Sequence, residues 1–113
     1  MKVNIESPHV LAYHLVRLDN VQADVPHFGL KSLLQRSGLP AKFDLVDITN
    51  IVMTELGQPM HVFDADKISG NVSVRQARDG EEMLALNGET YTLTKEDVVI
   101  ADEREVLAIA GVI

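Results

Sequence analysis

The stretch LVDITNIVMTELGQPMHVFDADKI, residues 45–68, decides the fold class. A helical pattern ends inside it, and the residues that follow it have strand patterns. Its first apolar residues recur at the spacing of one helix face, namely Leu45, Ile48, Val52 and Leu56. Gly57, with Pro59 two residues later, is a typical end for such a helix. The sequence therefore predicts a helix over residues 45–56, with Asp44 as its N-cap.

The residues after Ile68 follow the period of strands instead of that of a helix. Four segments alternate or run continuously apolar: residues 71–77, 81–93, 97–102 and 105–113. Within the second of them, Asn87-Gly88 is the strongest short signal for a β-hairpin. The last is almost entirely apolar and meets no turn before Ile113, so we expect the chain to be part of a longer one.

Upstream of residue 45 the sequence predicts one more strand and one more helix. Residues 10–18 (VLAYHLVRL) are rich in β-branched and aliphatic residues with partial alternation, as in a strand. Apolar residues at helical spacing then follow Asp24-Val25-Pro26 and end at Ser37-Gly38. The order is strand, two helices, then strands, which predicts an α+β fold. We expect two N-terminal helices packed on a mixed, mostly antiparallel sheet, as an incomplete domain without an internal boundary in residues 1–113.

The composition excludes several classes of function. With no cysteine, the 113 residues have no disulfide, thiol nucleophile or cysteine-bound zinc. The formal net charge is −7 and no stripe of Lys or Arg is visible, so the chain alone is a poor candidate for binding a long phosphate backbone. The charge does not exclude contact with one end of a nucleic acid that another domain holds. The sequence shows neither a signal peptide nor the roughly 20 apolar residues of a membrane span, and we expect a cytoplasmic protein.

The polar residues around Asn50 and His61 have plain structural interpretations. An exposed polar face of the predicted helix would contain Asp47, Asn50, Thr54 and Gln58. His61, in the turn after the helix, is typical of a packed or backbone-bonded histidine. His61, Asp64 and Asp66 are residue types that can bind a metal ion. In an extended segment, however, Asp64 and Asp66 would point to one side and His61 to the other. We predict no metal site, and the spacing of these residues alone does not indicate which reaction, if any, they catalyse.

The run VDITNIVMTELGQPMHVFDADKI closely resembles a signature of the bacterial phenylalanine–tRNA ligase beta subunit, in its central domain. The resemblance extends to LLQRSGLPA before this run and to VSVRQARDGEEMLALNG, EDVVIAD and LAIAGVI after it. These motifs follow one another in the family's order. Together they span nearly all of residues 10–113, which makes the resemblance specific.

This resemblance implies a role in charging tRNA. The family works as a heterotetramer of two alpha and two beta subunits that joins phenylalanine to its tRNA with ATP and magnesium. Its synthetic site lies on the alpha subunit, so the resemblance implies no cofactor within these 113 residues. The central domain of the beta subunit carries a hydrolytic editing site that removes tyrosine wrongly attached to tRNA(Phe). The implied partners are the alpha subunit and the 3′ end of tRNA(Phe), with no membrane.

Four positions match the family's editing pocket: Thr49, Asn50, His61 and Leu86. The resemblance implies that Asn50 and His61 are the catalytic pair, which orients the terminal nucleotide and the aminoacyl ester. Thr49 and Leu86 are the implied substrate-binding residues, and Leu86 packs on the aromatic ring. The family's glutamate for the tyrosine hydroxyl follows a Gly-Gly pair beyond the AGV run, which residues 1–113 do not reach. We therefore expect the 113 residues alone to have little or no editing activity.

Three positions depart from the family's pattern. Phe43 and Asp44 stand where the family usually has two asparagines, and Ile51 replaces its usual aromatic residue. These changes would reshape one wall of the implied pocket. A non-catalytic module of the same fold, which packs subunits or docks tRNA, is the first alternative. A free-standing protein that acts on a modified amino acid or a tRNA is the second. For the isolated chain, an unpaired apolar strand at 105–113 would favour self-association.

Overall fold

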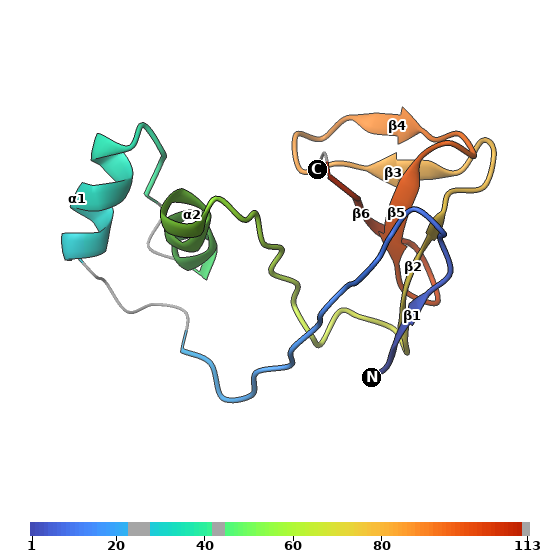
Figure 1. Ribbon diagram of the computed structural model, residues 1–113, viewed down its shortest axis with the longest axis horizontal. Coiled ribbons are helices and arrows are strands. Elements are labelled where there is room, and N and C mark those ends of the chain that lie inside the picture. Colours follow the sequence, from blue (N-terminus) through green and yellow to red (C-terminus); the bar gives the residue numbers. More distant parts are fainter. Residues whose placement is uncertain (23–27, 42–44, 112–113) are drawn as a thin grey trace. The chain divides into compact units, whose positions relative to one another are not determined.

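The computed structural model describes residues 1–22, 28–41 and 45–111 (Figure 1). The chain divides into two compact units, one formed by Met1–Val16 with Ala65–Ile113 and the other by Arg17–Asp64. We call the first the sheet unit and the second the helical unit, because the described strands all lie in the first and the described helices in the second. The predicted α+β class, with two helices and a mixed sheet, is confirmed.

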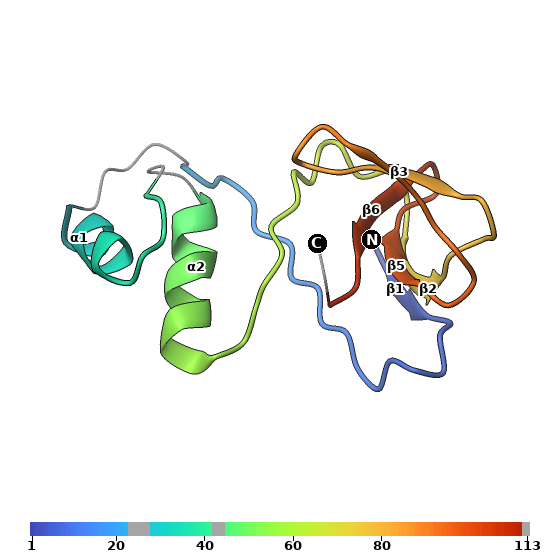
Figure 2. The same ribbon diagram turned by 90° about the horizontal axis from the view of Figure 1, so that it is seen from above.

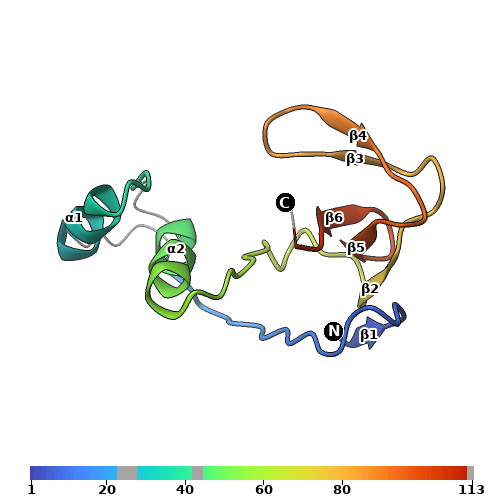
Figure 3. The same ribbon diagram turned by 45° about the horizontal axis from the view of Figure 1, so that its top comes forward.

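The sheet unit contains a four-stranded sheet and a separate hairpin. The sheet has the order β1 (Val3–Ile5), β2 (Val72–Gln76), β5 (Val98–Ala101), β6 (Val106–Ile109). Among the strands that the structure describes, β1 and β2 run parallel, and the other neighbours in this sheet are antiparallel. The hairpin consists of β3 (Glu82–Leu84) and β4 (Thr90–Thr92), and it lies over one face of the sheet (Figure 3). All four strand segments predicted after Ile68 are therefore confirmed.

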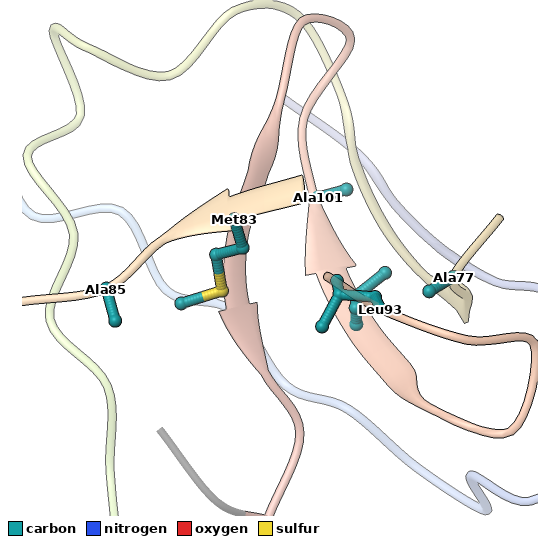
Figure 4. Packing of buried hydrophobic residues seen from close by; sticks show 6 residues of the cluster. Ala77, Met83, Ala85, Leu93 and Ala101 are labelled. Atoms are coloured by element: carbon teal, nitrogen blue, oxygen red, sulfur yellow. The ribbon is translucent and has the colours of Figure 1, made fainter. Parts of the chain in front are cut away.

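The core of the sheet unit forms between the hairpin and β5. Val99 and Ala101 of β5 point to the same side and are both completely buried. They pack with the other buried members of one hydrophobic cluster, Ala77, Met83, Ala85 and Leu93 (Figure 4). Half of this cluster is alanine, and such small side chains let the hairpin backbone approach the sheet closely. Burial of a single valine side chain contributes about 1.5–3 kcal/mol, so this interface stabilises the placement of the hairpin.

The strand predicted at residues 10–18 is wrong. Those residues form no ladder, and the strand beside β2 is instead Val3–Ile5. The chain leaves the sheet at Ser7, whose N–H still donates to the Val74 carbonyl oxygen at 3.2 Å, and Pro8 follows, which has no N–H to donate. Leu11, at 99% exposure, lies in a segment with strand-like composition, but no described strand pairs with that segment. Composition alone does not show whether such a neighbour exists.

The helical unit contains α1 (Phe28–Arg36) and α2 (Leu45–Leu56), which contact each other (Figure 2). Both predicted helix ends are confirmed, because Gly38 and Gly57 take left-handed backbone angles, with φ of 77° and 70°. After α1, the Leu39 N–H donates to the Leu34 carbonyl oxygen at 3.0 Å, which satisfies a carbonyl of the last turn. The predicted helix start at 24–26 and the predicted N-cap Asp44 lie outside the described residues.

The polar face predicted for α2 needs a correction at Asp47. This side chain is buried, at 8% exposure, whereas Ile48 and Leu56 of the predicted apolar stripe are 51% and 72% exposed. A carboxylate in the first turn lies near the unpaired backbone N–H groups and the positive end of the helix dipole, which lowers the cost of its burial. Thr54 and Gln58 are exposed, as predicted.

A turn between β5 and β6, residues 102–105, holds the segment that leads into β2. Asp102 is buried at 8% exposure, and its Oδ2 accepts a hydrogen bond from the Ser69 N–H at 2.7 Å. Its Oδ1 accepts from the N–H groups of Arg104 at 2.7 Å and Glu105 at 2.8 Å. The Arg104 guanidinium donates to the Lys67 carbonyl oxygen at 2.8 Å. Asp102 thus connects two segments that are more than thirty residues apart in the sequence.

Gly70 lies in the segment that this turn holds, and we predict that Gly70→Ala destabilises the chain by about 1–3 kcal/mol. Its φ of 71° is strained for any residue with a side chain. An added methyl group would also meet the Glu103 carboxylate, which accepts from the Asn71 N–H at 3.2 Å and would have to shift. Urea unfolding followed by circular dichroism measures the effect.

Gly29→Ala is the matched control for this substitution. Gly29 is helical, and a Cβ there meets no atom within 4 Å, so alanine should be neutral or stabilising. Equal unfolding free energies for Gly70→Ala and the unmodified chain would contradict the account of Gly70.

Candidate functional site

The residues implied to form the site are distributed over both units. Thr49, Asn50 and His61 belong to the helical unit, and Leu86 belongs to the sheet unit. Thr49 and Asn50 are both half-buried in the middle of α2. The Thr49 Oγ1 donates to the Val46 carbonyl oxygen at 2.8 Å, so its proton is committed to the helix and its lone pairs remain as acceptors.

The Asn50 carboxamide is not committed to the fold. Its backbone carbonyl accepts from the Thr54 Oγ1 at 2.8 Å, whereas its side-chain amide takes part in no hydrogen bond within the described part of the chain. An amide offers two donor protons and an acceptor oxygen. Asn50 therefore has all of its side-chain hydrogen-bonding capacity available for a ligand.

His61 lies in the irregular segment that follows α2, five residues beyond the helix end at Leu56. Its ring is exposed and contacts the ring of Phe63, with centroids 5.5 Å apart and planes inclined at 42°. An aromatic contact restricts the orientation of the imidazole while leaving its nitrogens open. No hydrogen bond or ring contact joins His61 to Asn50 among the residues that the structure describes.

Leu86 lies at the tip of the hairpin. The Gly88 N–H donates to the Ala85 carbonyl oxygen at 2.9 Å, so Leu86 and Asn87 are the central residues of the turn. Gly88 has φ of 83°, whereas the φ of Asn87 is not positive. This is a turn followed by a left-handed glycine, and not the two-residue turn with positive φ at both central positions. The predicted hairpin is confirmed, and its geometry leaves the Leu86 side chain fully exposed, at 102%.

The segment with His61, Asp64 and Asp66 does not assemble a metal site in the described residues. No group of three or more His, Asp or Glu side chains in the described ranges has a metal-binding arrangement. In the same ranges, no helix combines the length and the apolar character needed to cross a membrane.

Sequence reasoning missed a polar cavity of about 350 Å³ in the sheet unit. Its lining includes Asn4, Ser73, Arg75, Glu81, Asp102 and Arg104. The Arg75 guanidinium binds the Glu81 carboxylate through two bonds, Nη2–Oε1 at 2.6 Å and Nη1–Oε2 at 2.9 Å. The alternation of Ser73 and Arg75 with buried valines along β2 was the signal that could have located a polar surface here.

Two carboxylates of this cavity, Glu81 and Asp102, have pKa values that the fold lowers. The hydrogen bonds from Arg75 lower the pKa of Glu81 to about 2, against the opposing effect of burial. Burial alone would raise the pKa of Asp102, but hydrogen bonds from three backbone N–H groups and the nearby Arg104 charge lower it overall. Glu81 is bound by the Arg75 side chain and Asp102 by backbone N–H groups, so both carboxylates have partners within the sheet unit.

Comparison with known proteins identifies the family. The model of the B3/4 domain matches residues 11–113. The phenylalanine–tRNA ligase beta subunit of Methylococcus capsulatus is 45% identical over 97% of this chain, and that of Neisseria meningitidis serogroup B is 50% identical over 81%. The beta subunit of Haemophilus ducreyi is 40% identical over 99% of this chain.

The chain spans 12–14% of the length of these three curated relatives. The matches confirm the resemblance that the sequence motifs indicate. This chain belongs to the B3/4 domain family.

Proposed function

We propose that this chain is the part of a phenylalanine–tRNA ligase beta subunit that contributes to hydrolytic editing of tRNA(Phe) wrongly charged with tyrosine. The observation that carries the proposal is the match of nearly the whole chain to the B3/4 domain and to these beta subunits. The half-buried Asn50 carboxamide, the exposed imidazole of His61 and the exposed Leu86 side chain support it, because each can offer a polar or apolar group to a ligand.

The complete enzyme of this proposal is a cytoplasmic heterotetramer of two alpha and two beta subunits. ATP and magnesium act at the synthetic site on the alpha subunit, and this chain holds no cofactor. Its partners are the alpha subunit and the 3′ end of tRNA(Phe). Among the described strands, β6 lies at an edge of the sheet, through which we expect the isolated chain to self-associate.

Editing of tyrosine follows from the limits of the synthetic pocket. Tyrosine is phenylalanine with one added hydroxyl group, and an apolar pocket discriminates weakly against such a substrate. A second, hydrolytic site therefore has to recognise the hydroxyl and direct water at the ester. Orientation of the ester and stabilisation of the developing oxyanion supply much of the rate, and neither requires a strong nucleophile.

The side chains of the proposed site suit these tasks. The Asn50 amide and the His61 imidazole offer donors and acceptors for the terminal nucleotide and the ester. Thr49 is left with its acceptor lone pairs, because its hydroxyl donates to the Val46 carbonyl oxygen. Leu86 presents an apolar surface for the aromatic ring. Of the departures from the family pattern, Ile51 is half-buried on α2, and Phe43 and Asp44 lie outside the described residues.

We predict that His61→Ala in the complete ligase lowers the rate of Tyr-tRNA(Phe) deacylation about 100-fold, the usual effect of removing a positioned acid, base or orienting group. The aminoacylation rate with phenylalanine should not change, because the synthetic site lies on the other subunit. His14→Ala is the matched control, since His14 is also exposed and belongs to the sheet unit. Unchanged deacylation would remove His61 from the mechanism.

The isolated 113 residues should hydrolyse Tyr-tRNA(Phe) slowly or not at all, because they contain no match to the family's glutamate. Robust hydrolysis by the isolated chain would overturn that part of the proposal.

Subunit packing without catalysis is the second candidate function. It is favoured by large apolar side chains that are exposed on the helices, such as Phe28 at 75% and Leu56 at 72%. In that case His61→Ala and Asn50→Ala would leave deacylation unchanged, while Phe28→Ser and Leu56→Ser would reduce the yield of the assembled heterotetramer.

A further inference from the structure

Asn87 differs from the other asparagines of the chain in the residue that follows it. Asn4, Asn20, Asn50 and Asn71 each precede isoleucine or valine, whereas Asn87 precedes Gly88. In deamidation, the backbone nitrogen of the following residue attacks the carboxamide carbon of asparagine. A β-branched residue hinders this approach, and glycine does not, because it has no Cβ and the widest range of backbone angles. Both Asn87 and Gly88 are exposed.

We propose that Asn87 is the site of spontaneous deamidation in this chain, and that a hydrogen-bond network with Glu89 and Tyr91 sets the rate. The Gly88 nitrogen loses its proton to the solvent and bonds to the Asn87 Cγ. The Cγ–Nδ2 bond then breaks, and the nitrogen leaves as ammonia after taking a proton from water. Water opens the resulting cyclic imide to aspartate or isoaspartate, so no oxidant or reductant takes part.

The folded hairpin holds the reacting groups in other interactions. The Asn87 Oδ1 accepts from the Glu89 N–H at 3.0 Å, and the Asn87 Nδ2 donates to the Glu89 Oε2 at 3.1 Å and to the Tyr91 hydroxyl at 3.0 Å. The Tyr91 hydroxyl donates in turn to the Glu89 Oε2 at 2.8 Å, which closes the network. The N–H of Gly88, whose nitrogen is the attacking atom, donates a hydrogen bond to the Ala85 carbonyl oxygen at 2.9 Å. The bonds of the Asn87 carboxamide and of the Gly88 N–H therefore oppose the movement that brings the two reacting groups together.

Tyr91 connects this network to the core. It lies on β4, pairs with Met83 of β3, and its ring packs against the hydrophobic cluster of the sheet unit. The network is thus restrained by the fold although its members are at the surface. The reaction would add a negative charge next to Glu89, and isoaspartate would lengthen the main chain in the turn that presents Leu86. The inference stands independently of the proposed function, because it concerns only the chemistry of the hairpin.

The test is ageing of the folded chain at neutral pH, followed by peptide mapping with mass spectrometry and by enzymatic methylation of isoaspartate. Asn87 should deamidate before the four other asparagines. Tyr91→Phe keeps the ring but removes the hydroxyl, and with it the bond from Asn87 and the bond to Glu89. The rate at Asn87 should rise about fivefold, as expected when the Asn87 amide loses its one hydrogen bond of ordinary strength to Tyr91. Tyr13→Phe, a hydroxyl deletion elsewhere in the sheet unit, should leave the rate unchanged.

Denaturant separates the effect of the network from an effect of sequence. In concentrated urea the unmodified chain and Tyr91→Phe should deamidate at the same rate, because the network is absent from both. If Tyr91→Phe also lowers the unfolding free energy, Glu89→Gln carries the test, since Glu89 is exposed and its replacement weakens the network alone. Faster modification of another asparagine, or equal rates for the chain and both variants in the folded state, would overturn the proposal.

Discussion

Replacement of Asp102 with alanine is expected to lower the free energy of unfolding by about 3 kcal/mol, because three backbone N–H groups lose their acceptor. The carboxylate binds the N–H groups of Ser69, Arg104 and Glu105 at 2.7–2.8 Å and is 8% exposed. The Ser69 bond is the most costly to lose, since Ser69 is half-buried and joins distant parts of the sheet unit. Arg104 and Glu105 are exposed, so water can replace part of what they lose.

Two further variants make the measurement specific. Asp102→Asn keeps one acceptor oxygen but turns an NH₂ group toward a backbone N–H. We therefore expect it to lower the free energy of unfolding, but by less than Asp102→Ala does. Asp79→Ala is the matched control, since Asp79 is an exposed aspartate of another turn in the same unit. Urea unfolding followed by circular dichroism gives the three values. Equal stability for Asp102→Ala and Asp79→Ala would show that the 102–105 turn is not needed to hold the segment before β2.

The second large effect is a loss of stability in acid through the Arg75–Glu81 ion pair. The pKa of Glu81 falls from 4.5 to about 2 in the folded chain, first because of the hydrogen bonds from Arg75. A carboxyl group with a lowered pKa contributes stability that is fully present above pH 4.5 and is lost as the pH falls toward 2. At 1.36 kcal/mol per pKa unit, the contribution is at most about 3 kcal/mol, and the side chains are only 17% and 18% exposed.

Glu81→Gln tests this account. The variant should be about 2–3 kcal/mol less stable than the unmodified chain at neutral pH, and the difference should disappear near pH 2. Glu82→Gln is the matched control, because Glu82 is the neighbouring glutamate and is exposed on β3. Unfolding free energies measured in steps between neutral pH and pH 2 decide the matter. A constant difference between Glu81→Gln and the unmodified chain over that range would contradict the assignment.

Local signals in the sequence predicted the elements whose structure depends on few neighbouring residues. The helix over 45–56, its end at Gly57 and the hairpin at Asn87-Gly88 all follow from spacing and from residues that accept left-handed backbone angles. Even there the turn register differed in detail, since Leu86 and Asn87 occupy its central positions. The register depends on which residues of the two strands pair, and pairing is a property of the sheet unit.

Predictions were less successful where the structure depends on a residue or strand that is distant in the sequence. Residues 10–18 have the composition of a strand, but the neighbouring place beside β2 is taken by Val3–Ile5. Asp47 has the character of a surface residue and is buried. The motif EDVVIAD is one of those that resemble the family. The structural role of its last residue, Asp102, depends on Ser69, which is far away in the sequence.

The sequence by itself determined the α+β class, the helix ends, the hairpin and the family, since each depends on local residue patterns or on ordered motifs. It also named Thr49, Asn50, His61 and Leu86 through resemblance. Only the tertiary structure decided that Leu86 is fully exposed, that Arg75 and Glu81 form an ion pair, and that Asp102 binds the N–H of the distant Ser69. The physical reason is that burial, hydrogen-bond partners and pKa values arise from groups that the chain brings together only when it folds.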